Sequence, residues 1–402
     1  MRERAPDQPL WHQESNFDEK PTVSPYGYLL DGTAIACRSF DELRPALQEC
    51  SELRKVLYVW TPDSPYYLLI GEVEGLLDIL KPMRIESATE QLKSARQKAL
   101  IGGVIAAAVG FTEIQRYGIH FHRSPMIGLI GIIFLMFALV PFYESWKKLR
   151  TARKLDQSTL DEQSDEIRFD LWTMKQPCYL TKVLLGILVL IATLQWIAPV
   201  FTPFKGFSDT IFNAGIIKEA IRGGEGWRLW SAPFLHGNHI HIFMNASGLW
   251  YLGKRVEVLT RWPNLLFCYL LSILASSYTS YFFIAEGRPS IGASGGIMGL
   301  LGFLLIFEIL HPKLAPKPAR RRLLGIIILM VVMGLAGYQF IDNAAHAGGL
   351  IAGLAYGFLG FRKSDTVRRP VLSASDRLLG YSAGAILLGA AIFTILKMYQ
   401  LF

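Results

Sequence analysis

The sequence has few charged residues for a chain of 402 residues. Charged side chains make up 18% of it and hydrophobic side chains 51%, and the mean hydropathy is +0.30. This balance is too apolar for a soluble globular protein of this size. The scarcity of charge therefore predicts an integral membrane protein surrounded by the lipid bilayer.

The sequence is also poor in cysteine and has no leader-like start. Its four cysteines show no paired spacing, so we expect no disulfide framework. Residues 1–4 include an acid and no apolar stretch follows them, so we expect neither a signal peptide nor a transit peptide. The cysteines are Cys37, Cys50, Cys178 and Cys268.

Nine apolar segments are candidate membrane spans, since about 20 apolar residues cross a bilayer core. The first is short and carries Glu113, which makes it the weakest of the nine. The segments are Ala99–Ile114, Met126–Tyr143, Val183–Phe201, His239–Gly253, Pro263–Phe283, Ile291–Leu310, Leu323–Tyr338, Asp342–Phe361 and Leu378–Leu396.

Lysine and arginine gather in alternate gaps between these segments, which predicts a cytoplasmic amino terminus. We expect a bacterial inner (plasma) membrane, with the net charge of +8 anchoring the chain to the anionic inner leaflet. Because the basic residues are scattered between spans, we do not expect nucleic-acid binding. The basic groups lie within residues 93–98, 147–154, 254–261, 313–322 and 362–369.

Three of the apolar segments begin with polar residues of chemical interest. Near its start, one carries His241 and Asn245, one carries Ser294, and one carries Asp342 and His346. The predicted orientation makes all three run from outside to inside, so His241, Ser294 and His346 lie roughly 3–6 Å below the outer ends of their segments. Ionisable residues inside the membrane are functional candidates, and here they share one depth.

The spacing within the three segments fits a serine–histidine site. Glycines at helical spacing allow close helix approach in membranes, which a hydrogen bond of ~2.6–3.2 Å between Ser294 and His346 requires. His241 and Asn245, at i and i+4, share a helix face and can offer N–H donors to an oxyanion, with the Ser294 backbone N–H as a third. The glycines are Gly292, Gly295, Gly299 and Gly302, then Gly349, Gly353 and Gly357.

Each feature also has a purely structural explanation. A lone G-x-S-G sequence is mostly a helix-packing motif, and a lone buried histidine such as His346 is usually structural. Asp342 is better explained as a helix N-cap than as a partner that orients His346. His236, His239 and His241 are alternative metal ligands, but no carboxylate follows on the same helix, and zinc needs convergent ligands. We therefore predict no metal and no cofactor.

From about Thr181 to Arg362 the sequence resembles the rhomboid intramembrane serine proteases. The matching motifs are Trp227-Arg228, His236, His241-x-x-x-Asn245, Gly292-x-Ser294-Gly295 and Ala345-His346-x-x-Gly349-x-x-x-Gly353. The resemblance implies a six-helix bundle with a water-filled cavity that opens to the outside. It implies a catalytic dyad of Ser294 and His346, with His241 and Asn245 stabilising the oxyanion. It implies that Trp227-Arg228 is a structural motif of a loop and that His236 matches a histidine of that loop.

One position departs from the family pattern. Where an aromatic residue usually packs near the catalytic imidazole, this sequence has Met298. A thioether still contacts an aromatic ring favourably, by about 0.3–1.5 kcal/mol, so this change predicts tuning of the site and not loss of activity.

The predicted domains are a small soluble cytoplasmic α/β domain (1–95), two extra transmembrane helices with a charged linker (96–177), the rhomboid core (178–362) and an additional carboxy-terminal transmembrane helix (363–402). In the first domain, Lys55–Trp60 and Tyr66–Gly71 alternate like strands, and a capping box at Ser39 precedes a helix ending near Leu53. The linker Glu144–Lys175 is expected to be helical. A regulatory role or a cytoplasmic partner is predicted for the first domain.

The chain is thus expected to be an all-α polytopic membrane protein with a small α/β domain. The leading hypothesis is an endopeptidase that cleaves transmembrane proteins near the outer membrane face. The alternatives are a catalytically silent rhomboid-like protein that binds transmembrane clients, and a transporter or metal-dependent membrane enzyme that uses the histidine cluster.

Overall fold

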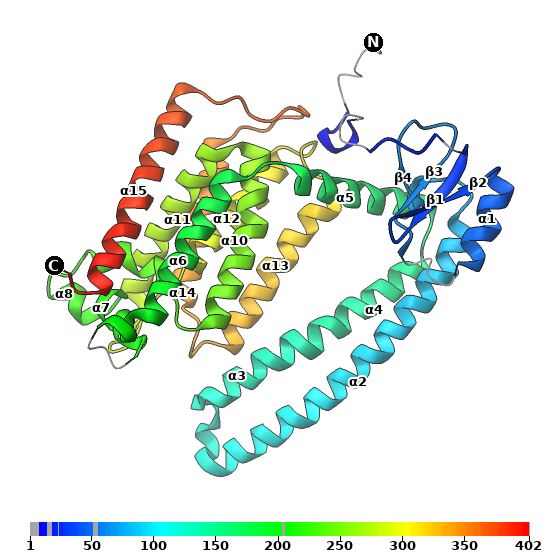
Figure 1. Ribbon diagram of the computed structural model, residues 1–402. Coiled ribbons are helices and arrows are strands. Elements are labelled where there is room, and N and C mark those ends of the chain that lie inside the picture. Colours follow the sequence, from blue (N-terminus) through cyan, green and yellow to red (C-terminus); the bar gives the residue numbers. More distant parts are fainter. Residues whose placement is uncertain (1–7, 14–17, 23, 51–54, 203–205, 402) are drawn as a thin grey trace. The chain divides into compact units, whose positions relative to one another are not determined.

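The computed structural model describes residues 8–13, 18–22, 24–50, 55–202 and 206–401. The chain divides into two compact units, and helix α13 contributes to both (Figure 1). Unit 1 comprises Met1–Trp172, Pro316–Pro318 and Val331–Phe340, and unit 2 comprises Thr173–Ala315, Ala319–Met330 and Ile341–Phe402.

Unit 1 begins with a four-stranded antiparallel sheet in the order β2-β1-β3-β4. The tight turn between the first two strands is made by Asp31 and Gly32, both with positive φ, which is the Asp-Gly hairpin signal. Our sequence analysis did not predict this hairpin. The strands are β1 (Tyr26–Leu30), β2 (Thr33–Cys37), β3 (Tyr58–Trp60) and β4 (Leu68–Leu69).

Helix α1 (Phe40–Glu49) packs beside this sheet and has the predicted N-cap, since the side chain of Ser39 accepts a hydrogen bond from the Glu42 backbone N–H. The helix ends before the predicted Leu53, which lies outside the described residues. The predicted second strand is shorter than expected, because the chain after β4 turns into a 3-10 helix at Ile70–Glu72. Buried leucines and valines form the core of this α/β domain.

A long helical hairpin follows (Figure 1). Helix α2 (Leu77–Tyr117) packs against the second arm, which runs from α3 (Pro125–Phe134) through a π-helical turn into α4 (Val140–Arg153). Pro141 explains the π turn, because its missing N–H interrupts the α-helical bonding. The predicted linker is helical in two pieces, since α5 (Gln157–Lys175) follows α4 after a short break.

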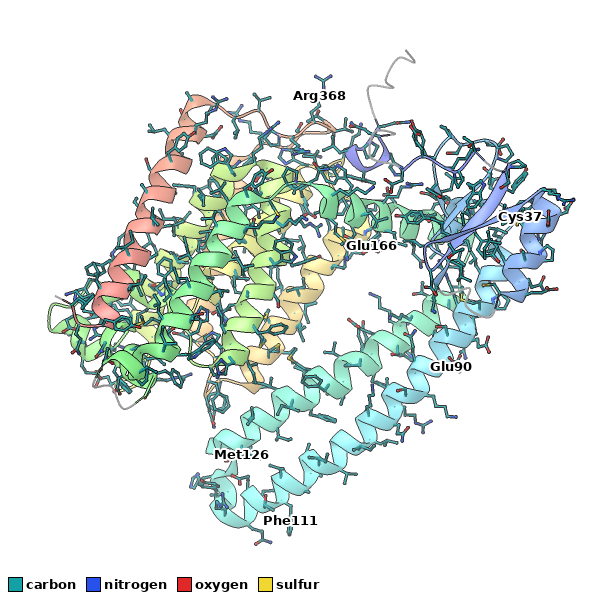
Figure 2. The ribbon with its side chains drawn as sticks, viewed as in Figure 1. Cys37, Glu90, Phe111, Met126, Glu166 and Arg368 are labelled. Atoms are coloured by element: carbon teal, nitrogen blue, oxygen red, sulfur yellow. The ribbon has the colours of Figure 1, made fainter. Side chains whose placement is uncertain are left out.

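The hairpin exposes apolar side chains along its length. Val104, Phe111 and Phe137 are 62–70% exposed, as expected of helices that face lipid. Figure 2 shows Phe111 and Met126 near the tip of the hairpin. Glu113 does not end α2, because its carboxylate is buried and accepts a hydrogen bond from the Ser124 hydroxyl.

Unit 2 is a helical bundle with a loop region of short helices. The short elements are α7 (Ser208–Ala214), α8 (Lys218–Arg222), α9 (Arg228–Ser231) and a 3-10 turn at Ala232–Phe234. The long helices are α6 (Tyr179–Phe201), α10 (His239–Thr260), α11 (Trp262–Phe283), α12 (Ser294–Leu310), α13 (Lys317–Ala336), α14 (Asn343–Gly360) and α15 (Ala374–Met398).

All nine predicted spans are helical in the structure. Among the described residues, five helices are long and apolar enough to cross a membrane: the two arms of the unit 1 hairpin, α6, α11 and α15. Of the other four, α12 is a shorter apolar helix of 17 residues. The predicted class, a helical membrane protein with a small α/β amino-terminal domain, is confirmed, whereas the exact domain boundaries stay predictions.

The helix that contains the predicted span His239–Gly253 is longer than that span. Helix α10 continues to Thr260, and Lys254 and Arg255 lie buried within it. These two charged side chains do not end the helix, because both have hydrogen-bond partners. Lys254 Nζ donates to the Met174 carbonyl at 2.8 Å, and the Arg255 guanidinium forms two hydrogen bonds of 2.7 Å with the Glu308 carboxylate on α12.

Glycine lets three helices of unit 2 pack at backbone distance. A methyl group on Gly353 would lie 1.8 Å from the Gly299 carbonyl oxygen, and one on Gly349 would lie 1.9 Å from the Gly295 carbonyl oxygen. On its other side α12 meets α11, where a methyl group on Gly295 would lie 1.8 Å from the Ser276 hydroxyl. The predicted close approach is therefore present, with α12 between α11 and α14.

We predict that Gly353→Ala destabilises the protein, because no neighbouring side chain can move away to relieve a clash with backbone. Overpacking of this kind costs about 1–3 kcal/mol. The measurement is the melting temperature of the detergent-solubilised protein. Gly389→Ala is the matched control, since its site on α15 is exposed with open space around a methyl group. Equal melting temperatures for both variants would show that the contact between α12 and α14 is loose.

Candidate active site

Ser294 and His346 face each other at one end of the unit 2 bundle. Ser294 is the first residue of α12, and His346 lies in the first turn of α14. The Ser294 hydroxyl oxygen and Nε2 of His346 are 2.8 Å apart. The structure thus brings together two residues separated by 52 positions, at the hydrogen-bond distance that a nucleophile and its general base require.

His241 and Asn245 converge on the backbone just before Ser294. A Cβ atom on Gly292 would lie 2.8 Å from Nε2 of His241 and 3.6 Å from Nδ2 of Asn245. Gly292 has φ of +120°, a conformation that favours glycine, and its N–H donates to the Ala232 carbonyl at 3.0 Å. The absence of a side chain at this position is therefore what admits both polar groups to the site.

The hydrogen bonding around these two residues leaves donors directed at the site. Nδ1 of His241 accepts the Gly237 backbone N–H at 3.4 Å, so the proton of the neutral ring belongs on Nε2. Asn245 is 5% exposed, and its Nδ2 has no acceptor among the described residues. A buried amide without an acceptor is costly in a folded protein, which makes Asn245 Nδ2 a candidate donor to a ligand.

His236 lies behind His241 and is held through its backbone. The Gln195 side chain on α6 accepts the His236 backbone N–H at 2.9 Å and donates to the His236 carbonyl at 3.4 Å. The two imidazole rings meet edge to face, with centroids 5.2 Å apart. Burial, and then the neighbouring His241, lowers the pKa of His236 to about 3, so this ring is neutral.

Sequence reasoning missed Gln195. The available signal was a polar side chain in the middle of an otherwise apolar predicted span, and such residues usually have a specific partner in the membrane. Gln195 is fully buried and also donates to the Thr210 hydroxyl at 3.2 Å.

Asp342 anchors the start of the helix that carries His346. It is the N-cap of α14, as predicted, and one carboxylate oxygen accepts the Ala345 N–H at 2.9 Å. The other oxygen accepts the hydroxyls of Ser280, on α11, and Ser290, in the loop before Ser294, at 2.5 and 2.6 Å. Sequence reasoning missed both serines, because nothing local links them to Asp342.

Trp227 and Arg228 lie in the loop region and stabilise it through hydrogen bonds and ring packing. Arg228 is buried and donates to the carbonyls of Phe212 and Gly215 at 2.8 and 2.9 Å. The Trp227 ring packs against Phe393 of α15, with centroids 5.7 Å apart. Both residues thus make packing and hydrogen-bond contacts within the loop region and with α15.

The remaining predicted residues occupy distinct places. Met298 is buried one turn after Ser294, at 4% exposure, and its contact with the His346 ring stays a prediction. The His239 ring packs against Trp196, with ring centroids 3.9 Å apart. No group of three or more histidine, cysteine or acidic side chains suited to a metal ion is found in the described part of the chain.

Comparison with known proteins places these residues in one family domain. Residues 223–363 match the rhomboid domain. The chain is 33% identical over 143 residues to RHOMBOID-like protein 4 of Arabidopsis thaliana and 36% identical over 155 residues to the rhomboid protease GluP of Bacillus subtilis. These stretches cover 36% and 38% of this chain. It is also 27% identical over 171 residues, 40% of this chain, to inactive rhomboid protein 1 of Rattus norvegicus.

The matched stretches cover 36%, 30% and 20% of these three relatives, so the likeness concerns the bundle and not the whole chains. Because the relatives come from a plant, a bacterium and a mammal, a bacterial membrane stays a prediction. The matched domain contains the Ser294–His346 pair, His241 and Asn245, and the Trp227-Arg228 loop. Residues 223–363 of the chain are thus a rhomboid domain.

Proposed function

We propose that this protein is an intramembrane serine endopeptidase that cleaves transmembrane proteins. The observation that carries the proposal is the 2.8 Å contact between the Ser294 hydroxyl and Nε2 of His346. A serine hydroxyl is a weak nucleophile unless a base accepts its proton, and His346 is positioned to do so.

In this mechanism Nε2 of His346 takes the hydroxyl proton as Ser294 Oγ attacks the substrate carbonyl carbon. A C–O bond forms, and the carbonyl oxygen acquires the negative charge. The imidazolium then gives the proton to the leaving amine as the C–N bond breaks, which leaves an ester on Ser294. A water molecule, deprotonated by His346, hydrolyses that ester and restores the serine.

The developing oxyanion would be met by three N–H donors: Nε2 of His241, Nδ2 of Asn245 and the backbone N–H of Ser294. The proximity of the first two groups to Gly292 supports this role, since Gly292 precedes the nucleophile by two residues. Donors fixed before the reaction stabilise this charge without reorganisation, which is often the largest single contribution to catalysis.

A substrate helix must unwind before its carbonyl can reach Ser294, because the hydrogen bonds of a helix occupy its carbonyl oxygens. The proposal therefore favours transmembrane substrates with a helix-destabilising segment at the depth of the Ser294 end of the bundle. With the predicted orientation, that depth lies near the outer membrane face.

The competing function is a rhomboid-like protein that binds transmembrane clients without cleaving them. The 27% identity to a relative named inactive rhomboid protein 1 keeps this alternative open. The presence of both Ser294 and His346 at hydrogen-bond distance favours the protease.

The first prediction concerns the proposed dyad. Ser294→Ala and His346→Ala should each abolish cleavage of a model transmembrane substrate in proteoliposomes, while the melting temperature stays near that of the wild type. The double variant should lose little more, because members of a catalytic unit are strongly non-additive. A serine-directed fluorophosphonate should label the wild type but not Ser294→Ala. Labelling that is equal in both proteins would contradict the assignment and favour the binding protein.

The second prediction concerns the oxyanion donors. Asn245→Ala should lower kcat by about 10²–10³ with little change in KM, since the interaction forms only in the transition state. Gly292→Ala should have a similar effect, because its methyl group would displace His241. Gly186→Ala, on an exposed and open face of α6, is the matched control. A raised KM with unchanged kcat would make Asn245 a substrate-binding residue instead.

The third prediction concerns Asp342. Asp342→Ala removes the N-cap and both serine contacts, and should destabilise the start of α14 by about 0.5–2 kcal/mol while lowering kcat through displacement of His346. Asp342→Asn should retain most of the stability, since asparagine is an equally good N-cap. Melting temperature and kcat are measured on the same preparations. If both variants keep full turnover, the anchor at Asp342 does not position His346.

A further inference from the structure

Unit 1 contains a pocket of about 780 Å³ that lies entirely within residues 56–167. Its walls come from the sheet domain, the start of α2, the end of α4, and α5. Leu69, Leu80 and Leu155 supply apolar wall, and Arg84, Lys147 and Lys148 supply positive charge. Pockets of about 300–1,000 Å³ that combine apolar walls with a few polar groups are typical of small-ligand sites.

The three cations of this pocket have no carboxylate partner among the described residues. Arg84 donates to the side-chain carbonyl of Gln163, and Lys148 donates to that of Gln91 at 3.3 Å. Elsewhere in unit 1 the buried Arg168 is paired with the carboxylate of Glu72. Arg84 is half-buried and bonded only to a neutral amide, and Lys147 and Lys148 are exposed side chains of the pocket lining. No carboxylate within ion-pair distance offsets these charges among the described residues, so the pocket is suited to an anion.

Two acidic side chains, Glu144 and Glu166, also line the pocket. Together with the three cations they leave a formal charge of +1, which still favours an anionic ligand. Their carboxylate oxygens can accept hydrogen bonds from hydroxyl or ammonium groups. The lining therefore fits a phosphate ester that also carries a polar head, better than it fits a bare anion.

The pocket lies where the helical hairpin meets the soluble domain. Tyr143 and Trp146 sit on α4 directly before Lys147, with ring centroids 6.1 Å apart, and the Arg150 guanidinium lies 5.5 Å from the Trp146 ring centroid. Tryptophan and tyrosine concentrate at the membrane–water interface, so the cations beyond them reach the depth of lipid headgroups. Figure 2 marks Glu90, next to Gln91, on α2 and Glu166 on α5.

We propose that this pocket binds the phosphate of an anionic glycerophospholipid headgroup, with Arg84, Lys147 and Lys148 as its ligands. A soluble phosphate ester would use the same contacts, so the experiment below separates the two sources. This site lies outside the matched rhomboid domain and does not depend on the proposed protease activity.

The test uses the full chain in an uncharged detergent. Binding is measured by titration with short-chain phosphatidylglycerol, short-chain phosphatidylcholine, glycerol 3-phosphate and inorganic phosphate. We expect saturable binding of phosphatidylglycerol and far weaker binding of phosphatidylcholine. The triple variant Arg84→Gln, Lys147→Gln, Lys148→Gln should raise the Kd about 100-fold, since each cation near the surface contributes roughly a factor of five.

The matched control is Lys93→Gln, Arg96→Gln, Lys98→Gln, which removes the same charge from exposed positions of α2 outside the pocket. It should keep the wild-type Kd. If the pocket variant melts early, the single exposed variant Lys147→Gln replaces it, with an expected fivefold rise in Kd.

If the control variant raises the Kd as much as the pocket variant does, the effect is general electrostatic attraction. That result would overturn the site. Failure of every phosphate compound to bind saturably would overturn it as well. Glycerol 3-phosphate that binds as tightly as the lipid, and competes with it, would keep the phosphate site but reject the lipid as its source.

Discussion

The backbone contact between α12 and α14 is the constraint on which the rest of the site depends. Gly295 and Gly299 on one helix face Gly349 and Gly353 on the other so closely that a single methyl group would meet a carbonyl oxygen. The first turns of both helices are thereby held together, and Ser294 lies 2.8 Å from Nε2 of His346. Without this approach, two short side chains on separate helices could not meet.

Polar contacts bind the bundle together where apolar attraction offers little. Lipid tails are as apolar as leucine, so helices in a membrane associate through packing and hydrogen bonds. The Arg255–Glu308 pair joins α10 to α12, and the Glu257 carboxylate accepts the N–H groups of Leu180 and Thr181 at the start of α6. The polar groups of Gln195 and Asp342 work in the same way close to the proposed active site.

The two units carry different chemistry. Unit 2 contains the proposed active site, where neutral N–H donors and a serine–histidine pair gather without a metal cluster among the described residues. Unit 1 contains a pocket in which three cations lack carboxylate partners in the described part of the chain. A ligand in that pocket would give the amino-terminal unit a role of its own beside the proposed proteolysis.

Sequence alone determined the class and supplied the candidate site residues. Apolar segment length indicated the spans, and the motifs around His241, Ser294 and His346 indicated the candidate site, because both signals are local along the chain. Tertiary structure alone decided where α10 ends, since Lys254 and Arg255 remain in the helix only because distant partners accept them. It also decided the parts played by Gln195, Ser280 and Ser290, because hydrogen bonds between residues far apart in the chain leave no local pattern.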